Sequence, residues 1–135
     1  MSEHDIKAKR PLSPHLQVYK PQMTSVMSIL HRATGVFLSL CSIVLLLAFC
    51  ITLICGAECY DAFIAALESF VGRGLLFVLT VCIFYHMFNG LRHLFWDSGK
   101  LFKIQNAYYA GAFVLLGTGA ASLGYWYCAY YFVLK

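Results

Sequence analysis

The sequence has little charge, and its few prolines are confined to one short segment. Of its 135 residues only 12% are charged, whereas 61% are hydrophobic. A soluble domain of this size carries about 25% charged residues. All three prolines lie between Pro11 and Pro21, where they prevent a regular helix. The composition therefore excludes an ordinary soluble domain and leaves no room for a separate soluble module.

Three long stretches lack charged residues altogether. They cover residues 36–54, residues 75–91 (where His86 is the only titratable base) and residues 107–134. With their flanks, each reaches the ~20 residues that cross a ~30 Å hydrocarbon layer as a helix. Their side chains do not alternate as barrel strands require, and only helices or closed barrels satisfy the backbone in lipid. The sequence predicts an all-α membrane protein with three transmembrane helices.

The predicted organisation is an N-terminal segment, residues 1–22, followed by a transmembrane domain, residues 23–135. The helices are expected at about 24–55, 68–96 and 106–133, and residues 56–70 are predicted to form a short loop. The third helix carries no ionisable acid or base suited to catalysis. It is interpreted as a packing helix through its small residues Gly117, Ala120, Ala121 and Gly124.

Other absences limit the chemistry. The six cysteines form no CxxC pair and no metal-finger spacing, so neither disulfides nor an iron–sulfur site is supported. The spans contain no carboxylate, which counts against a proton relay, a channel or a transporter. The polar N-terminus, with Glu3 and Asp5, does not read as a signal peptide or a retained transit peptide. A bacterial inner membrane is favoured, with the mitochondrial inner membrane as the alternative.

Basic residues are unevenly distributed. Eight of them lie before or within the first helix or near the end of the second and after it: Lys7, Lys9, Arg10, Lys20, Arg32, Arg92, Lys100 and Lys103. The opposite side holds Arg73 and Lys135 with the acids Glu58, Asp61 and Glu68. The positive-inside rule then puts the N-terminus in the cytoplasm or matrix. Because the positive charge sits beside spans, no nucleic-acid partner is expected. The segment from Pro11 to Pro21 is either an interfacial lead-in or a docking strip for a soluble partner.

The first helix begins with a polar stripe. Ser28, His31, Arg32 and Gly35 are three, four and seven residues apart and share one face, which Ser39 and Ser42 continue. Arg32 either snorkels to the interface or helps to line a polar pocket there.

The second helix places His86, Asn89, Gly90 and His93 on one face. His86 and His93 are about 10 Å apart along the axis, too far to ligate the same metal ion. Zinc would need further ligands one turn away, and the sequence has none there. A haem ligand and a structural histidine both remain open. A haem would need its second axial ligand from another chain.

Three segments carry a family resemblance: RPLSPHLQVYKP at residues 10–21, SILHRATG at residues 28–35 and YHMFNGLRHLFWDSGK at residues 85–100. Together they closely resemble the cytochrome b subunit of succinate dehydrogenase, the larger membrane anchor of respiratory complex II. The resemblance implies a bundle shared with a smaller anchor subunit, beside an iron–sulfur subunit and a flavoprotein. It also implies haem b and ubiquinone as ligands. The chain would transfer electrons and perform no bond chemistry alone.

The resemblance assigns roles residue by residue. His86 matches the haem b axial ligand, and the smaller anchor would supply the opposite histidine. Ser28 and Arg32 match the ubiquinone site, with Asp97 in the loop near it. His31 would lie between the quinone and the haem propionates, and Arg92 and His93 would contact propionates or the quinone side. Two related alternatives remain: a haem-free quinone-binding anchor, and a fumarate reductase anchor that uses menaquinone.

Overall fold

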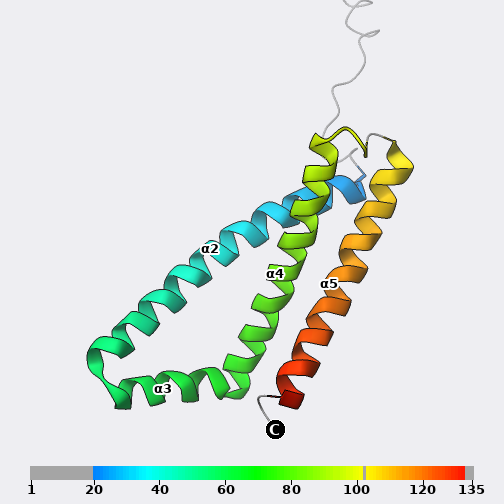
Figure 1. The fold of residues 1–135 in the computed structure, drawn as a ribbon. Helices are drawn as coiled ribbons and strands as arrows, with labels where there is room; N and C mark the ends of the chain where they lie inside the picture. The colour runs from blue at the N-terminus through cyan, green and yellow to red at the C-terminus, as the bar shows by residue number, and fades with distance from the viewer. Residues whose placement is uncertain (1–19, 102, 133–135) are drawn as a thin grey trace, which may run out of the picture.

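The computed structural model describes residues 20–101 and 103–132, and they form four helices. These are α2 (Met23–Cys55), α3 (Ala57–Glu68), α4 (Phe70–Asp97) and α5 (Ile104–Phe132). Figure 1 shows α4 and α5 running side by side and antiparallel, with α2 leaning away from them and α3 joining the far ends of α2 and α4. The proposed docking strip lies outside the described residues, except for Lys20 and Pro21.

Helices α2, α4 and α5 are each long and apolar enough to cross a membrane. The predicted class, an all-α membrane protein with three transmembrane helices, is confirmed. The observed helices span 23–55, 70–97 and 104–132, where about 24–55, 68–96 and 106–133 were expected. Most large apolar side chains on these helices are exposed, as a lipid-facing surface requires.

The segment predicted as a loop, residues 56–70, is instead largely helical. Helix α3 has 12 residues and buries none of them. Gly56, with φ 95°, ends α2 in a conformation that other residues rarely adopt. The residues after it contain no proline or glycine until Gly72, so nothing prevents a short surface helix. Ser69 separates α3 from α4, and its side chain accepts a hydrogen bond from the backbone N–H of Gly72.

The buried face of α5 overlaps only in part with the one expected. Its buried residues follow one another at intervals of three or four: Ala107, Gly111, Val114, Thr118 and Ser122. Of the four small residues predicted to pack, Gly117 lies beside the Phe88 ring, Ala121 is half-buried, and Ala120 and Gly124 are exposed. The apolar core consists of Val114 with Met27 and Tyr85, so α2, α4 and α5 all meet there.

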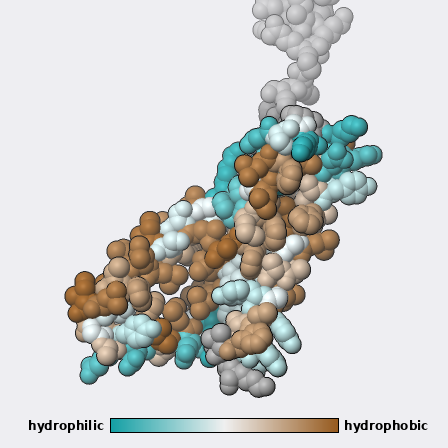
Figure 2. All heavy atoms as spheres, viewed as in Figure 1, coloured by the Kyte–Doolittle hydropathy of each residue, from teal (hydrophilic) through white to brown (hydrophobic). Residues whose placement is uncertain are grey.

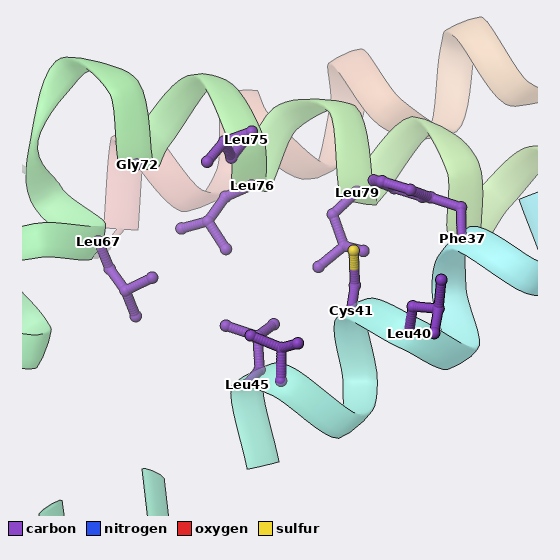
Figure 3. Close-up of a pocket in the computed structure, with 10 residues that line it drawn as sticks. Phe37, Leu40, Cys41, Leu45, Leu67, Gly72, Leu75, Leu76 and Leu79 are labelled. Atoms are coloured by element: carbon purple, nitrogen blue, oxygen red, sulfur yellow. The ribbon is translucent and has the colours of Figure 1, made fainter. Parts of the chain in front are cut away.

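The two ends of the bundle differ in charge, and hydrophilic residues gather at both of them (Figure 2). The basic end, where α2 begins, α4 ends and α5 begins, carries Lys20, Arg32, Arg92, Lys100 and Lys103. The acidic end carries Glu58, Asp61 and Glu68 on α3. Toward the acidic end, α2 and α4 diverge around a hollow of about 420 Å³. Its wall is apolar: Phe37, Leu40, Cys41, Val44, Leu45, Leu67, Gly72, Leu75, Leu76 and Leu79 (Figure 3).

Candidate site between helices α2 and α4

Three histidine rings meet where α2 crosses α4. The His31 ring stacks on His86, with centroids 4.0 Å apart and planes 13° from parallel. The centroid of the His31 ring also lies 5.1 Å from the centroid of the His93 ring. His86 and His93 are two turns apart on α4, and His31 of α2 is inserted between them. The structure thus brings the three rings together between α2 and α4.

The orientation of His86 is set by the α2 backbone. Its Nδ1 lies 3.1 Å from the carbonyl oxygen of His31 and 3.3 Å from the hydroxyl of Thr34. Gly35 makes this approach possible, because a Cβ at that position would lie 2.9 Å from Cε1 of His86. No hydrogen bond involves Nε2 of His86 among the described residues.

A buried polar chain lies next to the histidines. The Met27 carbonyl accepts hydrogen bonds from the Tyr85 hydroxyl at 3.0 Å and from the Asn89 amide at 3.4 Å. The amide oxygen of Asn89 in turn accepts from Nη1 of Arg92 at 3.3 Å. Asn89 is fully buried and Arg92 is 3% exposed. These bonds fix how far α2 is shifted along α4.

Arg92 and His93, which the resemblance assigned to the propionates or the quinone side, both lie against the ring of Trp96. The guanidinium carbon of Arg92 lies 4.1 Å from the centroid of the Trp96 ring. The Trp96 ring also contacts His93, with centroids 5.3 Å apart, and its Nε1 donates to the carbonyl of Leu101 at 3.0 Å. The rings of His86, His31, His93 and Trp96 form a continuous series from the middle of α4 to its basic end.

The predicted quinone residues of α2 line a polar hollow. It has a volume of about 400 Å³ and is lined by Thr24, Ser25, Ser28, Ile29, Arg32 and Trp96. The structure thus brings Ser28 and Arg32 of α2 together with Trp96 of α4. Asp97, which the resemblance put near the quinone site, is exposed and is not among the lining residues. Ser39, on the expected continuation of the stripe, donates to its own helix at Gly35.

Thr34 and Tyr85 also escaped prediction. Thr34 follows His31 by three residues, so helical spacing could have placed it on the stripe. Nothing in the pattern around Tyr85 indicates that its hydroxyl reaches another helix.

Among the described residues, no cluster of three or more His, Cys, Asp or Glu side chains could hold a metal ion.

Comparison with known proteins identifies the family. The pattern of the succinate dehydrogenase/fumarate reductase transmembrane subunit matches residues 7–125. The succinate dehydrogenase cytochrome b560 subunit of Reclinomonas americana is 37% identical over 118 residues, which cover 84% of this chain and 81% of the relative. The cytochrome b556 subunit of Rickettsia conorii is 35% identical over 125 residues, or 93% and 97% of the two chains.

The mitochondrial cytochrome b560 subunit of Homo sapiens is 37% identical over 125 residues, covering 89% of this chain and 72% of the relative. The relatives therefore come from bacteria and from mitochondria. Since the family pattern spans most of the sequence, including α2, α4 and most of α5, this chain belongs to the succinate dehydrogenase/fumarate reductase transmembrane subunit family, among the cytochrome b subunits that anchor succinate dehydrogenase in the membrane.

Proposed function

We propose that this anchor subunit binds one side of a haem b through His86 and contributes Ser28 and Arg32 to a ubiquinone-reduction site. The hydrogen bonding of His86 carries the proposal. A backbone carbonyl only accepts hydrogen bonds, so the contact between Nδ1 of His86 and the His31 carbonyl requires the proton to be on Nδ1. In the neutral ring the lone pair is then on Nε2, the form that ligates iron.

The surroundings of His86 fit a haem ligand. Metal-ligating histidines commonly donate their second ring N–H to a carbonyl, which fixes the tautomer and the ring orientation. Thr34 supports this arrangement, since its hydroxyl hydrogen can go to the carbonyl of Leu30 at 2.8 Å while its oxygen accepts from Nδ1. Gly35 leaves the space that the ring occupies.

The second axial ligand would come from another chain. His31 stacks face to face on His86 at 4.0 Å, so it would not serve as the second ligand of a haem held by His86. A histidine of the smaller anchor subunit is the ligand that we propose. When bound, the haem would supply a one-electron redox centre with a potential set by its axial ligands and its burial.

The polar hollow suits a quinone head group. Reduction places negative charge on the quinone oxygens, and Arg32 and Ser28 can donate hydrogen bonds to them. His31 and His93 lie between this hollow and His86, where they can contact propionates or the quinone. Asp97 is exposed at the same end of the bundle, and we place it at the entrance of the quinone site.

The charge of the two ends of the bundle suggests where the iron–sulfur subunit and the flavoprotein would bind. An iron–sulfur subunit would dock at the basic end, close to Arg32, so that electrons reach the quinone by a short path, with a flavoprotein oxidising succinate beyond it. This end would face the cytoplasm or the matrix. The relatives described above are named succinate dehydrogenase subunits, which favours ubiquinone reduction over a fumarate reductase that uses menaquinone.

The test is a reduced-minus-oxidised visible spectrum of the purified complex. We expect b-type bands that are lost or strongly changed by His86→Leu and are unchanged by Met87→Leu, an exposed neighbour on the same helix. An unchanged spectrum in His86→Leu would refute the assignment of the ligand. A complex that reduces quinone without b-type absorption would instead be a haem-free anchor.

A further inference from the structure

Arg92 is a buried cation beside which none of the residues that the structure describes places a carboxylate. It is 3% exposed, and within the described part of the chain its Nε and Nη2 have no hydrogen-bond acceptor. Its one hydrogen bond, from Nη1, goes to the neutral Asn89. An uncompensated buried charge normally destabilises a fold strongly. The charge of Arg92 is therefore difficult to explain as packing alone.

The guanidinium also lies over an aromatic face. Its central carbon lies 4.1 Å from the centroid of Trp96, well inside the ~6 Å range of a cation–π interaction. Such contacts strengthen when the cation is desolvated, as it is here. A carboxylate beside Arg92 would compete for the charge, and none of the described residues provides one. The arrangement leaves the charge of Arg92 directed at Trp96.

Trp96 of α4 lines the polar hollow together with residues of α2, among them Ser28 and Arg32. The chain of contacts that holds Arg92 begins on α2 as well, because Asn89 donates to the carbonyl of Met27, the residue before Ser28. Asn89 and Arg92 thus link the α2 backbone beside Ser28 to the Trp96 indole. One buried polar chain therefore contacts both helices that line the hollow.

We propose that Arg92 is a positioning residue for the quinone site: it holds the Trp96 indole as a flat part of the lining that includes Ser28 and Arg32, without touching the quinone itself. The inference rests on the proposed function of the hollow. Arginine suits the task better than lysine, because a planar guanidinium stacks on an aromatic ring while it donates to a second group. A lysine ammonium would keep the charge but would lose the stacking and the fixed geometry.

The test is a double-mutant cycle in the purified complex, with a short-chain ubiquinone as acceptor. Arg92→Lys is expected to raise the KM for the quinone roughly 3- to 30-fold, the range that loss of a cation–π contact allows. Trp96→Leu should raise it as well, and the double variant should be no worse than Trp96→Leu alone, because residue 92 acts through residue 96. Succinate oxidation by a dye acceptor should be unchanged. Arg73→Lys, an exposed arginine at the other end of α4, is the matched control.

Two results would overturn the positioning role. One is an unchanged KM in Arg92→Lys, or effects of the two substitutions that multiply. The other is a parallel loss of dye-linked activity and haem, which would make Arg92 a structural residue. If Arg92→Lys does not assemble, Arg92→Gln, which keeps a donor for Asn89, goes through the same cycle. Failure of both variants to assemble would also overturn it. Arg32→Ala separates the two proposals: normal quinone reduction in that variant would refute the quinone site itself.

Discussion

The ring of His31 lies flat against the ring of His86, 4.0 Å away, although the two residues are 55 positions apart in the sequence. The contact joins the start of α2 to the middle of α4. Because the His31 carbonyl also receives Nδ1 of His86, one residue of α2 sets both the position and the tautomer of the candidate haem ligand. Changes on α2 should therefore be visible in the haem spectrum.

Gly35→Ala should disturb the haem site without removing its ligand. The new Cβ would lie 2.9 Å from Cε1 of His86, so the imidazole must move or α2 must shift away. We expect a shifted or broadened low-spin spectrum and a stability loss of about 1–3 kcal/mol, typical of overpacking. The reduced-minus-oxidised visible spectrum measures the first effect, and the half-life of the complex on heating measures the second.

Gly119→Ala is the control for that substitution. Gly119 is also in a membrane helix, and a Cβ there meets nothing within 4 Å. This variant should keep the wild-type spectrum and match or exceed wild-type stability, because alanine is a better helix former by up to ~1 kcal/mol. Equal behaviour of the two alanine variants would contradict the close approach of His86 to Gly35.

Arg32→Ala should slow electron delivery to quinone while leaving succinate oxidation intact. Loss of a hydrogen bond from a charged donor corresponds to roughly 10- to 100-fold in succinate–quinone activity. Arg32 is exposed in this chain, so its removal should not destabilise the bundle. Succinate oxidation by an artificial dye is measured in parallel, and an equal loss of both activities would point to faulty assembly.

Gly72→Ala should weaken the corner between α3 and α4. A Cβ at Gly72 would collide with the backbone carbonyls of Ala66 and Leu67, which cannot rotate away as a side chain can. We expect a loss of at least about 1–3 kcal/mol, seen as a shorter half-life of the complex on heating. Gly74→Ala, two residues further along α4 in open space, should cause no loss. A stable Gly72→Ala complex would mean that this corner is more open than described.

The orientation of the chain can be tested by thiol labelling. In a variant whose only cysteine is Cys59, on α3, an impermeant maleimide should react from the periplasmic or intermembrane side. In a cysteine-free variant carrying Ser98→Cys, after α4, it should react only once the cytoplasmic or matrix side is opened. The reverse pattern would invert the proposed topology, and with it the docking side of the iron–sulfur subunit.

The sequence predicts the membrane helices well because lipid imposes one simple condition, a long stretch without charge. The observed and expected ends of α4 differ by two residues at the start and one at the end. Helix α3 was missed for the same reason, since a short surface helix with acidic residues meets no such condition. The packing face of α5 was predicted only in part, since Gly117 and Ala121 are half-buried whereas Ala120 and Gly124 are exposed. Small residues occur all round that helix, and the positions of Val114 and Thr118 depend on α4 and α2.

The candidate site, too, could be predicted from the sequence only in part. Helical periodicity alone places His86 and His93 on one face of α4, and the stripe of α2 contains His31. How far α2 is shifted along α4 is not encoded in either periodicity. That shift inserts His31 between the other two histidines and buries Arg92 behind Trp96. Contacts between helices therefore had to come from the structure.

The length of α2 has a consequence for the membrane itself. Its 33 residues extend about 50 Å, well beyond a hydrocarbon layer of ~30 Å. A helix of such length tilts to fit, and α2 leans away from α4 toward the acidic end (Figure 1). In a thinner bilayer we expect α2 to tilt further and the apolar hollow to widen. The contacts of Met27 and His31 lie where α2 crosses α4, close to the pivot, so the redox site would be displaced least when membrane thickness changes.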